Sequence, residues 1–104
     1  GNAGVAVGYN TRQLPVLTLW KNTDTRAQGY VTGIEPGTSY AYSTKYQRPL
    51  GLVPKIQPGE TKTFDLTYRL LRNGEEVKQA LAQVDKIQAG RSTELREQPL
   101  VKLP

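Results

Sequence analysis

Glu35 is the residue of this sequence whose setting best suits chemistry. It follows an apolar strand predicted at residues 30–34 and stands directly before Pro36-Gly37, which predicts a turn. Burial among apolar residues makes a carboxylate a stronger base, which suits proton abstraction. An ion pair between Glu35 and a nearby Lys or Arg at the sheet end explains the residue equally well. The residues alone leave both interpretations open.

Most other kinds of catalytic site are excluded by composition. The chain has no His and no Cys, so it offers neither a Ser-His-Asp nor a Cys-His arrangement, and the commonest metal ligands are missing. The remaining acidic residues fall in predicted turns, on the polar face of a strand or on a helix surface, and none has the spacing of a calcium or phosphate loop. We therefore expect no metal and no cofactor. Nothing in the sequence indicates the cellular compartment.

The charge distribution argues against nucleic acid and membrane partners. The formal net charge is +5, from 14 Lys and Arg against 9 Asp and Glu, but the basic residues are spread singly from Arg12 to Lys102. The aromatic residues are not spaced like a platform for stacked bases. No stretch approaches the roughly 20 apolar residues of a membrane span.

The residues before position 71 predict short strands separated by turns. Residues 14–20 (LPVLTLW) and 29–35 form two β-rich runs, and residues 38–48 fit either an irregular strand or a binding loop. Residues 61–70 are the clearest strand, because Phe64, Leu66, Tyr68 and Leu70 alternate with polar residues. We expect strands over residues 5–70.

The period then changes to that of a helix. Apolar residues at Val77, Ala80, Leu81, Val84 and Ile87 mark one face of a helix over residues 75–89. Asn73 is a predicted N-cap that Glu76 completes as a capping box, and Gly90 suits the C-terminal cap. The polar tail, residues 91–104, carries Pro99 and Pro104 and is expected to run over a surface.

These elements predict a mainly β fold, an antiparallel β-sandwich with one C-terminal α-helix. The strands number about four or five, whereas a complete sandwich usually needs about seven. The chain also lacks any Met. We therefore expect residues 1–104 to be one segment of a larger sandwich. Its exposed sheet would be covered by the rest of the parent domain or by another copy of the chain.

The ordered set "LTLW", "GYVTGIEPGTS" and "PGETKTFDLTYRL" resembles the C-terminal part of aldose 1-epimerase (galactose mutarotase)-like proteins, over residues 14–70. The helix and tail resemble an addition found in a less-characterised branch. The resemblance implies a galactose mutarotase-like supersandwich that binds an aldose. In that family a strand ending in Trp precedes an apolar strand ending in Glu-Pro.

The resemblance also implies a chemistry for Glu35. It matches the general base that takes the proton from the C1 hydroxyl of the sugar, while a histidine protonates the ring oxygen. This chain has no His, so the acid would lie upstream and the chain alone would be inactive. The segment "GTSYAYSTKY" departs from the family pattern and leaves the sugar open.

Three aromatic residues are candidates for stacking on a sugar ring: Trp20, Tyr40 and Tyr42. Aromatic residues in a β-sandwich, however, more often lie in the core. The parent protein is then either an isomerase or, as the alternative, a non-catalytic β-sandwich module that binds carbohydrate or packs against a partner domain.

Overall fold

The computed structural model describes residues 1–98, in two compact units that we treat separately. Within the described residues the first unit is residues 1–7 and 67–98, and the second is residues 8–66. The elements follow the chain in this order: β1 (Gly4–Tyr9), β2 (Val16–Lys21), the 3-10 turn η1 (Arg26–Gln28), β3 (Thr32–Gly37), α1 (Thr44–Gln47), the 3-10 turn η2 (Arg48–Leu50), β4 (Leu66–Leu71) and α2 (Gly74–Gln88). The mainly β class is confirmed, with two-stranded sheets β1–β4 and β2–β3.

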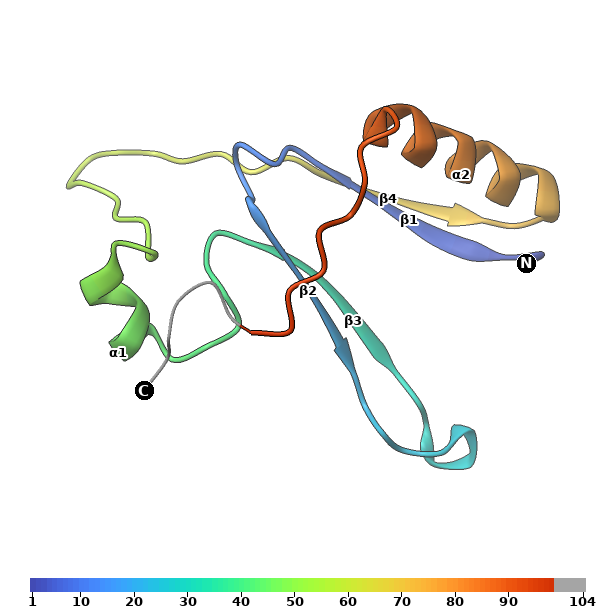
Figure 1. The fold of residues 1–104 in the computed structure, drawn as a ribbon, viewed down its shortest axis with the longest axis horizontal. Helices are drawn as coiled ribbons and strands as arrows, with labels where there is room; N and C mark the ends of the chain where they lie inside the picture. Colours follow the sequence, from blue (N-terminus) through green and yellow to red (C-terminus); the bar gives the residue numbers. More distant parts are fainter. Residues whose placement is uncertain (99–104) are drawn as a thin grey trace. The chain divides into compact units, whose positions relative to one another are not determined.

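The second unit is built on the antiparallel β2–β3 ribbon (Figure 1). Asn22 closes its connection, because its side chain accepts a hydrogen bond from the Val31 amide (3.1 Å) and donates one to the Gly29 carbonyl (3.3 Å). Pro36 and Gly37 do not form the predicted turn. They are the last residues of β3 and pair with Leu17 and Val16. Proline is tolerated there because, within residues 1–98, β3 pairs only with β2, and an edge strand can do without one N–H donor.

Residues 38–50 form a folded loop with two short helices, α1 and η2, rather than the irregular strand that was one of the two expectations. Its centre is Gln47, which is 1% exposed. The Gln47 amide accepts a hydrogen bond from the Tyr40 backbone N–H and donates to the carbonyls of Tyr40 and Tyr42, over 2.7–3.0 Å. Because one side chain satisfies three backbone groups, the loop holds its shape without a ladder of strand hydrogen bonds.

In the first unit α2 packs along the β1–β4 sheet (Figure 1). Gly4 of β1 lies close to both partners, since a Cβ on it would stand 3.5 Å from Leu71 Cδ1 and 3.9 Å from Val77 Cγ2. Leu71 and Ala80 are buried at this contact. Arg69 donates a hydrogen bond to Gln83 of α2 over 3.1 Å. The helix therefore covers the face of β4 that carries Arg69 and Leu71.

This packing corrects the strand predicted at residues 61–70. β4 begins only at Leu66, because Asp65 instead bonds to Gln13 through its side chain and its backbone N–H. The buried face is also the opposite one. Tyr68 and Leu70, assigned to the apolar face, are 67% and 74% exposed, while Leu71 is 7% exposed.

The helix prediction is confirmed to within one residue at each end, with the predicted N-cap. Asn73 Oδ1 accepts the Glu76 amide over 2.9 Å. Glu76 does not close the capping box on Asn73, because its carboxylate accepts the Arg72 amide instead. Ala89 and Gly90 both take left-handed conformations at the C-terminal end. Part of the predicted tail, including Pro99 and Pro104, lies outside the described residues.

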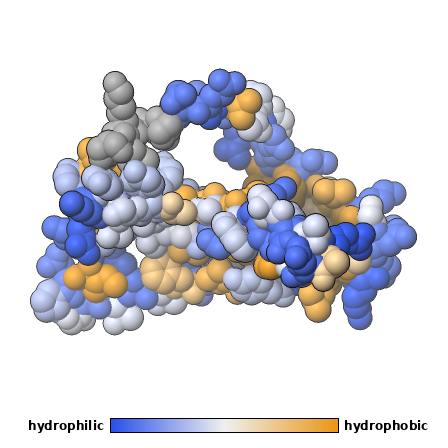
Figure 2. Space-filling model, turned by 90° about the horizontal axis from the view of Figure 1, so that it is seen from below, coloured by the Kyte–Doolittle hydropathy of each residue, from blue (hydrophilic) through white to orange (hydrophobic). Residues whose placement is uncertain are grey.

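The apolar core is small. Among residues 1–98 the buried apolar residues are Leu14, Leu71 and Ala80, and many large apolar side chains are exposed. Figure 2 shows such side chains reaching the surface on the face drawn. No helix in this part of the chain has the length and apolar character needed to cross a bilayer.

Candidate functional site

The β2–β3 ribbon brings Trp20 and Glu35 to the same face. The register pairs Trp20 with Gly33 and Thr18 with Glu35. Directly paired residues of an antiparallel ribbon point to one side, so Thr18, Trp20 and Glu35 share a face, which we call the glutamate face. Trp20 and Glu35 are diagonal neighbours across Gly33, a separation of about 7–8 Å that an indole and a glutamate side chain can span.

The opposite face of the ribbon is apolar. It carries Leu17, Leu19 and Ile34, which are all exposed in this chain. In a β-sandwich the apolar face packs on the core and the polar face is accessible. This division favours the glutamate face as the side that meets a ligand.

The side chain of Glu35 folds back along β3 over Gly33. A Cβ at position 33 would contact Glu35 Oε1 and would stand 3.2 Å from Glu35 Cδ and 3.4 Å from Cγ. The carboxylate therefore occupies space that any other residue at position 33 would fill. It lies over the backbone on the side where Trp20 is paired.

The expected apolar surroundings of Glu35 are not found in this chain. Val31 and Ile34 are 51% and 38% exposed, and Glu35 is exposed too. None of the ion pairs within residues 1–98 involves Glu35, so the local pairing partner considered above is not found either. Within the described structure the carboxylate faces open space.

Tyr40 and Tyr42 are not brought into this arrangement. They lie on the loop ordered by Gln47, where the Tyr42 ring packs against that of Tyr46, with ring centroids 5.8 Å apart. Both are partly exposed. No hydrogen bond or ring contact within residues 1–98 joins them to Trp20 or Glu35.

A groove of about 740 Å³ begins where β3 ends. Its walls come from residues 12–15, from Gly37 and Thr38, and from residues within 54–64. It presents the cations Arg12 and Lys62 beside apolar side chains such as Ile56 and Phe64. This groove is not predictable from the sequence, because it depends on segments about 50 residues apart that the Gln13–Asp65 pair holds together.

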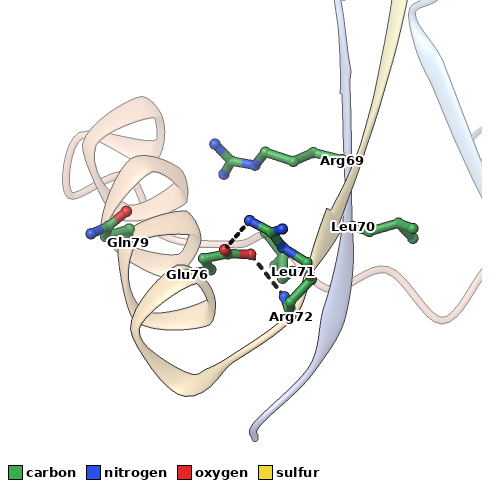
Figure 3. Close-up of a pocket in the computed structure, with 6 residues that line it drawn as sticks. All are labelled: Arg69, Leu70, Leu71, Arg72, Glu76 and Gln79. Carbon is green, nitrogen blue, oxygen red and sulfur yellow. Dashed lines mark hydrogen bonds and ion pairs between the residues drawn. The ribbon is translucent and has the colours of Figure 1, made fainter.

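A second hollow, of about 370 Å³, lies between β4 and α2 (Figure 3). Its charged groups are paired with one another. The Arg72 amide donates to Glu76 over 2.8 Å and the Arg72 guanidinium over 2.9 Å, and these bonds lower the pKa of Glu76 below 4.5. Figure 3 shows Arg69 directed toward the helix and Leu70 away from it. These contacts stabilise the start of α2. The glutamate face is therefore the better candidate functional site.

The chemistry of the glutamate face is that of a lone base beside an aromatic surface. Residues 1–98 contain no group of three or more metal-binding side chains. An exposed carboxylate can accept a proton from a hydroxyl, and an indole can support the apolar face of a sugar ring.

Residues 1–70 match the family described as a domain of unknown function, DUF4432. A crystal structure from Klebsiella pneumoniae subsp. pneumoniae, described as a putative aldose 1-epimerase, is 50% identical to this chain with a TM-score of 0.90. The match covers 99% of this chain and 27% of that one, so this chain spans about a quarter of its length. No curated protein sequence matches the chain. The resemblance to aldose 1-epimerase-like proteins and the mainly β fold are confirmed.

Proposed function

The chain belongs to the DUF4432 family, and from this we propose that it is the C-terminal part of an aldose 1-epimerase-like protein in which Glu35 is the general base. The observation that carries the proposal is the pairing of β2 with β3, which makes Glu35 and Trp20 diagonal neighbours on one accessible face, with Gly33 opposite Trp20 and Thr18 opposite Glu35. The 50% identical relative, described as a putative aldose 1-epimerase, supports the same class of reaction.

In anomer exchange the glutamate face would remove the proton from the C1 hydroxyl of the sugar. The Glu35 carboxylate takes the proton from the C1 hydroxyl while an acid protonates the ring oxygen, and the bond between C1 and the ring oxygen breaks. Rotation about the C1–C2 bond then presents the other face of the carbonyl, and ring closure with both proton transfers reversed gives the other anomer. Trp20 would hold the sugar ring so that C1 lies beside the carboxylate.

The acid belongs outside this segment. Histidine is the commonest general acid, and these 104 residues contain none. We propose that the remaining part of the parent domain supplies it, and that the same part covers the apolar face of the ribbon, formed by Leu17, Leu19 and Ile34. An apolar face of this kind in a β-sandwich normally packs on a second sheet.

The test uses the full-length protein that carries this segment, with Glu35 replaced by Gln. The amide keeps the shape of the side chain but cannot take up the proton. We expect anomer exchange, followed by polarimetry on freshly dissolved single anomers, to fall by roughly 100- to 10,000-fold. The affinity for the sugar should change little.

Two outcomes contradict the proposal. If Glu35→Gln keeps the wild-type rate, Glu35 is not the base. If the wild-type protein binds an aldose without accelerating its anomer exchange, the module is a non-catalytic carbohydrate-binding one.

A further inference from the structure

Gly33 stands at the centre of the glutamate face. It is paired with Trp20 across the ribbon and lies two residues before Glu35 on the same strand. The Glu35 carboxylate lies so close over it that a Cβ would contact Oε1, with Glu35 Cδ at 3.2 Å. Any side chain at position 33 would therefore push the carboxylate away.

The backbone does not explain the glycine. The glycines with positive φ in the described structure are Gly29, Gly51, Gly59 and Gly90, and Gly33 is not among them. An L-residue could adopt its extended conformation without strain. A glycine inside a strand also weakens the strand, because it loses more conformational freedom on folding and packs no side chain. The space that a side chain at position 33 would fill is instead occupied by the carboxylate of Glu35.

We infer that Gly33 is a positioning residue, whose missing side chain lets the Glu35 carboxylate fold back over β3 toward the position of Trp20. The inference rests on the proposed role of Glu35 as the base. With the carboxylate over Gly33, its oxygens lie on the side of the strand where a sugar ring against the indole would present a hydroxyl. A methyl group at position 33 would turn the carboxylate along or off the strand, out of line with that hydroxyl.

The experiment is a double-mutant cycle in the full-length protein, with the variants Gly33→Ala, Glu35→Gln and the two combined. We expect Gly33→Ala to lower kcat for anomer exchange by about 10- to 100-fold, with KM little changed, since a small misplacement of a catalytic group has effects of this size. Gly33→Val, with its larger side chain, should lower kcat further. In the Glu35→Gln background Gly33→Ala should cause no additional loss, because the base on which it acts is already gone.

Stability provides the second measurement. Replacing an extended glycine by alanine reduces the freedom of the unfolded chain, so the melting temperature of Gly33→Ala should be equal to or above that of the wild type. Gly4→Ala is the matched control. It also changes a strand glycine without positive φ, but the added Cβ would meet Leu71 and Val77 at ordinary distances of 3.5–4.0 Å. We expect it to leave kcat unchanged.

The outcomes separate the inference from the proposed function. If Glu35→Gln abolishes exchange while Gly33→Ala keeps the wild-type kcat, the positioning role is wrong and the base assignment stands. If Glu35→Gln itself remains active, the proposed function fails and the inference fails with it. If Gly33→Ala lowers kcat by the same factor in the Glu35→Gln background as in the wild type, the inference is overturned. A melting temperature of Gly33→Ala below that of the wild type would show that Gly33 acts through folding, which also overturns it.

Discussion

At the scale of single residues, Trp20 tests whether the glutamate face binds a sugar. Its side chain is 50% exposed, so its removal deletes little packing inside this chain. If the indole stacks on the sugar, Trp20→Ala in the full-length protein should weaken sugar binding by about 2- to 10-fold, the equivalent of roughly 0.5–1.5 kcal/mol for an aromatic contact. The value of kcat should change much less, and Trp20→Phe should recover most of the affinity.

Titration of sugar binding by calorimetry, beside a thermal melt of each variant, measures both effects. An unchanged affinity together with a lower melting temperature would assign Trp20 to packing against the rest of the parent domain.

The sequence predicts the roles of some single residues and not of others. An ordered set of strand and turn residues indicates Glu35 and Trp20, and the register places them on one face. The sequence does not predict the role of Gln47, because this role depends on three backbone groups that converge only when the loop folds. Glutamine has no local preference that marks it as the buried centre of a loop. The significance of Gly33 likewise depends on which way the Glu35 side chain turns, which no spacing specifies.

At the scale of elements, the start of α2 gives a pH-dependent prediction. The Glu76 carboxylate accepts hydrogen bonds from the Arg72 amide and guanidinium, which lower its pKa below 4.5 in the folded chain. Because the pKa is lower folded than unfolded, the charged carboxylate stabilises the helix at neutral pH. That contribution is lost as the pH falls below 4.5 and through the lowered folded pKa.

Thermal unfolding of wild type and Glu76→Gln, followed by far-UV circular dichroism, should therefore differ at neutral pH and converge in acid. The difference should be modest and should shrink with added salt, because the Arg72 side chain is 81% exposed and that of Glu76 is still 27% exposed. Glu75→Gln is the matched control, since Glu75 lies in the same first turn but, within residues 1–98, its side chain accepts a hydrogen bond only from the Gln79 side chain, over 3.2 Å. A difference between wild type and Glu76→Gln that persists in acid would contradict the assignment.

The sequence predicts some elements better than others. Elements specified by interactions between residues close in sequence are predicted well, and elements that depend on packing against distant segments are not. The helix is specified by its own cap and period, so its ends were predicted to within one residue. The strand at 61–70 was placed by alternation alone, and its buried face was assigned wrongly. Alternation indicates two faces but not which of them a neighbouring helix covers, and here α2 covers the face of Leu71. Pro36-Gly37 resembled a turn locally, but pairing with β2 extended the strand through both residues.

At the scale of the whole molecule, the small core and the exposed apolar residues bear on what the chain does alone. Within residues 1–98, Leu14, Leu71 and Ala80 are the buried apolar residues, while the apolar face of the ribbon and the outward side of β4 are exposed. Such surfaces are normally covered in a folded domain, and uncovered sheet faces promote association. This chain matches 27% of the length of the 50% identical structure.

We therefore expect the isolated 104-residue chain to give no anomer exchange above buffer with any common aldose. One base without an acid cannot both remove the C1 hydroxyl proton and protonate the ring oxygen.

The same sample should bind a dye for exposed apolar surface and should self-associate in sedimentation experiments, because its apolar faces are exposed. Expressed as part of the full-length protein, the segment should lose the dye binding, melt in one cooperative transition and gain the activity. Exchange by the isolated chain that disappears in Glu35→Gln would show that these residues contain both the base and the acid. A monomeric isolated chain that does not bind the dye would show that the exposed faces need no further cover.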